Sequence, residues 1–160
     1  MAFDAFLKIE GPDGDSTRRG FEKQLELKSF NWGATNQTAI SAGGAGAGKV
    51  SVTTFNISKK TDVASPRLFQ SCCNGTHYPK AVLTLSRQGS GSPDDFMKYE
   101  FESVYVESVQ WSGAIGADDT PLESVSFAFG KVSVTYTPQN PDGSKGSPSV
   151  GTWDLTRGSA

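Results

Sequence analysis

The segment from Gly43 to Lys49 has the spacing of a phosphate-binding loop: a glycine, four further residues, Gly48 and then the lysine. In such loops a serine or threonine follows the lysine and holds the metal ion, and a helix begins there with its N-terminus aimed at phosphate. Here Val50 follows, and the next residues, VSVTTF, are typical of a strand. We therefore interpret the segment as a flexible connection between two strands, and we expect no nucleotide binding.

Residues that could act as catalysts are scattered along the sequence. His77, the one histidine, could be a general base, but no Gly-x-Ser-x-Gly motif supplies a nucleophile. The acidic pairs Asp94–Asp95 and Asp118–Asp119 lie in segments with turn composition, which favours solvated loop charges over a catalytic pair. The basic pairs Arg18–Arg19 and Lys59–Lys60 are most simply solvated or pairing across an interface. The sequence therefore predicts no catalytic residues and no enzyme.

Cys72 and Cys73 are the only cysteines and are adjacent. A disulfide between neighbours needs a strained geometry. With a single histidine in the chain, no Cys/His set for a metal ion can be assembled. We expect two reduced, buried thiols, and neither a metal nor a cofactor.

The overall composition excludes several function classes. The net charge is −2, from 15 basic and 17 acidic residues, with no concentrated basic block, which argues against nucleic-acid binding. No apolar run approaches the roughly 18–20 residues of a membrane span, so we expect no membrane insertion. The first residues carry Asp4 where a signal peptide would be basic and then apolar. We therefore expect a cytoplasmic protein, or one exported without a cleaved signal.

One short helix is well marked. Ser65 can cap it, Pro66 fits the first helical position, and Asn74-Gly75 supplies a left-handed stop. One predicted face carries Leu68, Phe69, Cys72 and Cys73. A lone short helix buries little by itself, so we expect it to pack against a β-structure.

Apolar and polar residues alternate in most of the remaining chain, as in strands with one buried face. Turn-rich loops are expected at residues 11–20, 89–95, 112–121 and 138–151. The alternating segments are residues 3–9, 25–32, 50–57, 81–85, 99–106, 125–129, 132–136 and 152–155. They predict a mainly β fold, an antiparallel β-barrel or sandwich with one short flanking helix.

In four segments the apolar residues change phase part-way along, for example between Leu27 and Phe30. A strand that is buried on one side keeps its phase. One explanation is a bulge of the kind found at barrel corners. The other is that one strand end faces its own core and the other end faces a neighbouring subunit. The candidate interface residues are then Phe30, Trp32, Phe55, Ile57, Val132 and Val134.

Several stretches, in this order and spacing, resemble the Hcp family, the tube protein of bacterial type VI secretion. They include the opening AFDAFLKIEGPDGDS, then SFNWG, and then KVSVTTFNISKKTDVASPRLFQSCCNG, where a strand leads into a K-x-D-x-x-S-P-x-L helix ending at glycine. FGKVSVTYTPQNPDG and the terminal GTWDL resemble the closing strands of that family. Residues 39–48 and 138–151 match none of its motifs.

The resemblance implies a single domain over residues 1–160, built as a β-barrel with a flanking helix. It implies that six copies close a ring and that rings stack into a hollow tube. The partners would be further copies of the chain and the sheath, spike and effector proteins of the type VI apparatus. The protein would be cytoplasmic before firing and then secreted through that apparatus without a cleaved signal peptide.

Residues 38–49 are the candidate for ring stacking. They are small and uncharged except for Lys49, and such a segment is too flexible to hold its own shape. Joining two strands needs far fewer residues. Since the resemblance implies a tube, we hypothesise that the segment reaches along the tube axis and pairs its backbone with the next ring. The residues concerned are Thr38, Ala39, Ile40, Ser41, Ala42, Gly43, Gly44 and Lys49.

Two other classes of function stay open at this point. One is a β-sandwich that binds a ligand or carbohydrate through exposed aromatic residues such as Trp32, Trp111 or Trp153. The other is an enzyme, which the scattered catalytic residues disfavour. The mass in solution separates them, because a ring of six supports the tube, whereas a monomer that binds sugars supports the sandwich.

Overall fold

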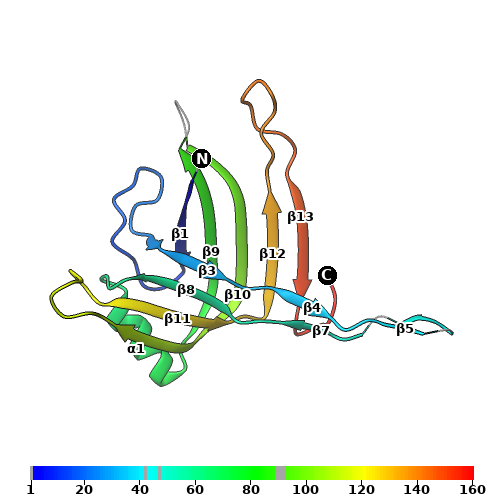
Figure 1. Ribbon diagram of the computed structural model, residues 1–160, viewed down its shortest axis with the longest axis horizontal. Coiled ribbons are helices and arrows are strands. Elements are labelled where there is room, and N and C mark those ends of the chain that lie inside the picture. The colour runs from blue at the N-terminus through cyan, green and yellow to red at the C-terminus, as the bar shows by residue number, and fades with distance from the viewer. Residues whose placement is uncertain (1, 42, 47, 89–92) are drawn as a thin grey trace.

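The computed structural model describes residues 2–41, 43–46, 48–88 and 93–160. Within these residues the chain is mainly strand, with a single helix (Figure 1). The elements are β1 (Phe3–Ile9), β2 (Leu25–Leu27), β3 (Ser29–Asn31), β4 (Ala34–Asn36), β5 (Ala39–Ser41), β6 (Gly44–Gly46), β7 (Val50–Val52), β8 (Phe55–Lys60), α1 (Ser65–Asn74), β9 (His77–Gln88), β10 (Pro93–Ser112), β11 (Leu122–Ala128), β12 (Lys131–Tyr136) and β13 (Ser149–Asp154).

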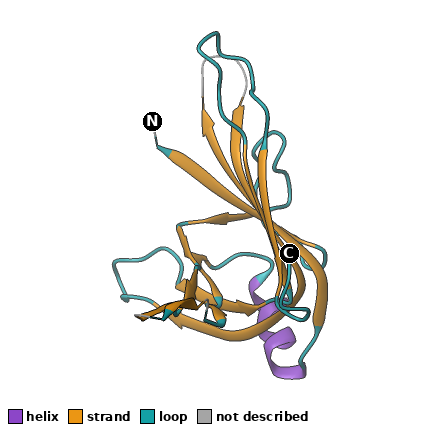
Figure 2. Ribbon diagram, turned by 90° about the vertical axis from the view of Figure 1, so that its right-hand side faces the viewer, coloured by secondary structure: helices purple, strands orange, loops and turns teal. Residues whose placement is uncertain are grey.

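Nine strands form one antiparallel sheet that folds over on itself. Its order is β2-β1-β9-β10-β11-β8-β3, with β12 beside β10 and β13 beside β12. The long strand β10 pairs with β12 over residues 97–102 and with β11 over residues 105–112. Between these two stretches lies Ser103, whose left-handed φ of 56° marks the bend. In Figure 1, β3, β8 and β11 accordingly cross the long strands, and Figure 2 shows the same two layers from the side.

The core lies between these two layers. Phe101 is at its centre: its ring lies 4.4 Å from that of Phe55 and 4.7 Å from that of Phe129. Leucines from β1, β2 and β9 complete the core, including Leu7 and Leu83, both fully buried. The sheet does not close into a continuous barrel among the described strands, so the fold is an open, sandwich-like version of the predicted antiparallel architecture. The predicted fold class is confirmed.

The changes of phase fall at strand ends and bends. Val52 ends β7 and Phe55 begins β8, while Phe129 and Val132 lie on either side of Gly130, between β11 and β12. Both sides of each change face the same core, because the chain turns there. The explanation by bulges and corners is therefore the one that the structure supports.

The prediction that these side chains face a neighbouring subunit is wrong for three of them. Phe55, Ile57 and Val132 are at most 5% exposed and belong to the chain's own core. Their apolar surface is already covered. Phe30, Trp32 and Val134 are partly buried and pack against the same core.

The helix α1 occurs where predicted, but it buries a different face. Gly75 ends it with a left-handed φ of 70°, as expected. At the other end Ser65 is the first helical residue and not the cap, and the Asp62 carboxylate accepts the Ala64 N–H at 3.0 Å. The buried side chains of the helix are Ser65, Leu68 and Ser71.

The expectation of two buried thiols is wrong for Cys73, which is exposed. Cys72 is partly buried and donates its S–H to the Glu107 carbonyl at 3.5 Å. Phe69 is half exposed. The helix turns its serines inward because they find polar partners there: Ser71 is hydrogen-bonded to the Tyr78 hydroxyl.

The expectation that residues 38–49 hold no shape of their own is also wrong for their described part. Ala39–Ser41 pairs with Gly44–Gly46 as a short antiparallel ribbon. Backbone pairing needs no side-chain packing, so this composition can still form strands. Ala42 lies outside the described residues. Two predicted loops are shorter than expected, since β10 begins at Pro93 and β13 at Ser149, and residues 89–92 also lie outside the described residues.

Candidate assembly site

A two-stranded arm, residues 34–52, projects from the body along the long axis of the molecule (Figure 1). At its root the Gly33 N–H donates to the Thr53 hydroxyl at 2.8 Å, and the Thr53 N–H donates to the Gly33 carbonyl at 2.9 Å. The pairs β4–β7 and β5–β6 then continue outward, separate from the main sheet. Near the tip, Ile40 is 85% exposed. The arm therefore offers backbone and one apolar side chain far from its own core.

An open groove of about 580 Å³ lies beside the root of the arm. Lys49 lines it together with Val52 from β7 and Trp153 and Leu155 from the C-terminal segment. The residues of the predicted stacking segment are thus divided. Thr38, Ile40, Gly43 and Gly44 extend outward on the arm, whereas Lys49 lies near its base.

Two strands of the main sheet have a free edge among the described residues. β13 pairs only with β12, and β3 pairs only with β8. A free edge presents unpaired N–H and C=O groups, which form a template for a strand of another chain. Val150 on β13 is 61% exposed, which adds apolar surface at that edge.

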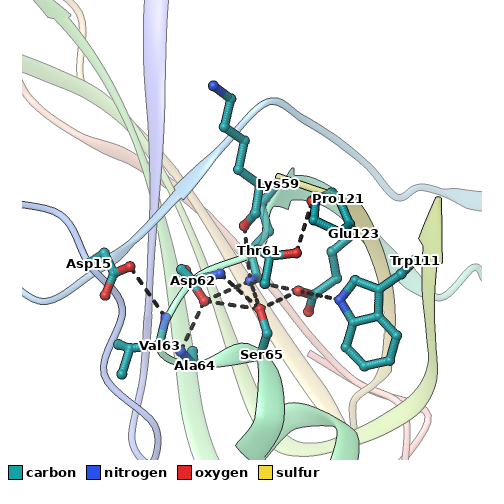
Figure 3. Close-up of polar contacts among 11 residues, drawn as sticks. Asp15, Lys59, Thr61, Asp62, Val63, Ala64, Ser65, Trp111, Pro121 and Glu123 are labelled. Carbon is teal, nitrogen blue, oxygen red and sulfur yellow. Dashed lines mark hydrogen bonds and ion pairs between the residues drawn. The ribbon is translucent and has the colours of Figure 1, made fainter. Parts of the chain in front are cut away.

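A buried ion pair joins β8 to β11 (Figure 3). The Lys59 ammonium lies 3.1 Å from Glu123 Oε2 and 2.8 Å from Asp62 Oδ1, and the Lys59 and Glu123 side chains are both fully buried. Lys59 also donates to Ser65 Oγ at 3.0 Å. Ser65 Oγ donates to Glu123 Oε2, and the Trp111 indole N–H donates to the same oxygen at 3.2 Å.

The sequence contained a signal for this cluster that charge composition alone hid. Lys59 continues the inward phase of Phe55 and Ile57, and Glu123 precedes Val125 in the same inward phase. The two residues are directly opposite in the β8–β11 register. Solvation of Lys59 is therefore a wrong prediction, because both charged residues stand where apolar ones were expected.

The residues that could do chemistry are not brought together. The His77 ring contacts that of Tyr105 at 5.1 Å, at one end of β9 and β10. Asp94 lies within β10 and pairs with Arg87 at 3.2 Å, so its placement in a loop is a wrong prediction. Asp118 accepts the Ala114 N–H at 2.8 Å within its own loop. No group of acidic, histidine and cysteine side chains suited to a metal ion occurs among the described residues.

The clear pKa shifts occur mostly in exposed turns. The Ser144 hydroxyl and N–H lower the pKa of Asp142, and the Thr156 hydroxyl, with two backbone N–H groups, lowers that of Asp154. Backbone hydrogen bonds lower the pKa of Glu22, and burial raises that of Tyr99. Asp142 and Asp154 order the turns that flank β13, a structural role rather than a catalytic one.

Comparison with known proteins decides between the classes of function left open. The model of the family described as "Type VI secretion system effector, Hcp" matches residues 6–136. The chain belongs to the Hcp family. Protein hcp1 of Pseudomonas aeruginosa is 33% identical over 157 residues, covering 97% of this chain and 96% of that protein.

Solved Hcp structures share the fold at full length. A structure of a type six secretion system protein superposes with a TM-score of 0.91 at 33% identity, covering 98% of both chains. Hcp1 from Salmonella typhimurium gives a TM-score of 0.79 at 31% identity, covering 98% of this chain and 97% of that one. This Hcp protein is therefore a subunit of the type VI secretion tube, as the sequence resemblance implied.

The carbohydrate-binding alternative finds no support in this Hcp chain. Trp32 is partly buried, with its ring edge-on to Tyr99, Phe101 and Phe129. Trp111 is tied to Glu123, and Trp153 packs against the core. The three tryptophans therefore do not form an exposed platform. Among the described residues, no helix is both long and apolar enough to cross a membrane.

Proposed function

We propose that six copies of this tube subunit close into a ring and that the rings stack into a hollow conduit for effector proteins. The observation that carries the proposal is the match to Hcp proteins over nearly the whole chain, combined with an arm that extends beyond the core. A heterologous contact that repeats after a fixed rotation closes a ring.

The free edges of β13 and β3 are our candidates for the contact within a ring. They belong to opposite ends of the strand order, so the β13 edge of one copy can meet the β3 edge of the next. This replaces the buried side chains of Phe55, Ile57 and Val132 with backbone groups as the contact. Phe30, on β3, remains part of the proposed interface.

The arm is our candidate for the contact between rings. Its ribbon has no partner sheet in the chain's own body among the described strands, and its composition allows close backbone approach. A tube subunit of this kind needs surfaces and a lumen, not a catalyst. We propose that it is not an enzyme, that it is cytoplasmic before firing, and that the sheath and spike are its partners in export.

Sedimentation velocity tests the ring proposal. Between about 1 and 100 μM protein, we expect a species with six times the mass of one chain. A monomer throughout that concentration range would overturn the ring. Variants that carry a proline at Thr152, on the edge strand, should shift the population toward monomer, because proline removes an edge N–H and does not fit a paired strand.

A further inference from the structure

The helix α1 buries too little apolar surface to hold its own position. Its ten residues are fewer than the roughly 12–15 that an isolated helix needs even for marginal stability. Of its three buried side chains, Ser65 and Ser71 are polar, and only Leu68 is large and apolar. Contacts other than apolar packing must therefore fix the helix on the sheet.

The buried ion pair lies at the N-terminus of this helix and contacts it through Ser65 (Figure 3). With Asp62 included, the cluster holds one positive and two negative charges, so one negative charge is in excess. The N-terminal end of a helix dipole favours such a charge. The first turn of α1 has no acidic residue of its own, so carboxylates from β11 and from the turn before the helix take that role.

A buried pair of this kind adds little net stability, because the loss of hydration offsets most of the attraction between the charges. Its charge-assisted hydrogen bonds are nevertheless short and directional. Glu123 Oε1 adds a cost, since it is buried without a hydrogen-bond partner among the described residues. The cluster therefore constrains position more than it stabilises the fold.

We propose that the Lys59–Glu123 ion pair is a positioning device for α1 and Trp111. It holds the first turn of the helix through Ser65 and the indole through Glu123 Oε2. The Trp111 ring in turn lies 5.8 Å from that of Phe69 on the outer side of the helix. Without the pair, the helix loosens while the sheet beneath it stays folded.

Hydrogen exchange tests this proposal in the double variant Lys59→Met/Glu123→Leu. We expect the α1 amides to exchange at least tenfold faster than in the parent protein, Trp111 fluorescence to change, and the exchange of Leu83 on β9 and the urea midpoint to stay the same. The matched control is Lys131→Met/Glu102→Leu, which removes an exposed cross-strand pair with a 3.6 Å contact and should leave α1 protection unchanged.

Three results would overturn the proposal. The first is α1 protection equal to that of the parent. The second is loss of protection in α1 and β9 together with a lower urea midpoint, which would make the pair an ordinary stabilising contact. The third is a double variant that does not fold. Ser65→Ala provides a second measurement, because it removes the helix's own link to an intact pair; faster exchange confined to α1 is expected, and unchanged exchange would contradict the proposal.

Discussion

Shortening the arm separates ring stacking from folding. The change replaces residues 38–49, twelve residues in all, with a four-residue turn. No buried core residue lies in this segment, and Ile40 is 85% exposed, so almost no apolar burial is lost. The closure entropy of the connection falls by (3/2)RT ln(12/4), which stabilises the fold by about 1 kcal/mol. Loss of the β5–β6 hydrogen bonds offsets part of this gain, since each contributes about 0.5–1.5 kcal/mol net.

We therefore expect the free energy of unfolding of the shortened protein to lie within about 1 kcal/mol of the parent value, measured by urea denaturation. Rings should still form in sedimentation experiments, whereas stacked tubes in electron micrographs and secretion from cells should be lost. A matched control keeps the arm length and changes only Ile40→Ala. Because the proposed contact is made by the backbone, this variant should stack as the parent does.

Two results would refute the reasoning about the arm. If the shortened protein stacks and is secreted normally, the arm does not mediate stacking. If its rings fall apart although the monomer is stable, the arm belongs to the contact within a ring instead.

Three further predictions concern the body of the subunit. Phe101→Ala should lower the free energy of unfolding by about 3–5 kcal/mol, because it empties the centre of the aromatic core; a loss below about 1 kcal/mol in urea denaturation would contradict this. Thiol labelling of native protein should modify Cys73 before Cys72, and equally slow labelling of both would count against the exposure of Cys73. In Thr156→Ala, the pKa of Asp154 should rise toward 3.8 in an NMR titration, since its main hydrogen bond is lost. The lowered pKa contributes stability that is present above about pH 3.8 and lost as the pH falls through the folded-state pKa, so an unchanged pKa in the variant would argue against the hydrogen bond.

The strands and the helix end could be predicted because each has a local physical cause. Alternation in residues 3–9 and 125–129 follows from burial of one face, and Gly75 is suited to the left-handed residue that ends α1. The resemblance to Hcp proteins then supplied the function, which local patterns alone could not.

The remaining features depend on pairing between distant segments. The ribbon of β5 and β6 is held by backbone groups, so its glycines and alanines give no alternating signal. Ser65 turns inward because Lys59 and Glu123 lie there, and Glu123 is 64 residues beyond Lys59 in the chain. Helix periodicity predicted an apolar buried face because it could not include those polar partners.

Electron microscopy of the purified protein tests the central claim most directly. The account predicts six-fold symmetric rings with an open centre, some of them stacked end to end. Particles the size of a single chain, without rings at any concentration, would contradict it.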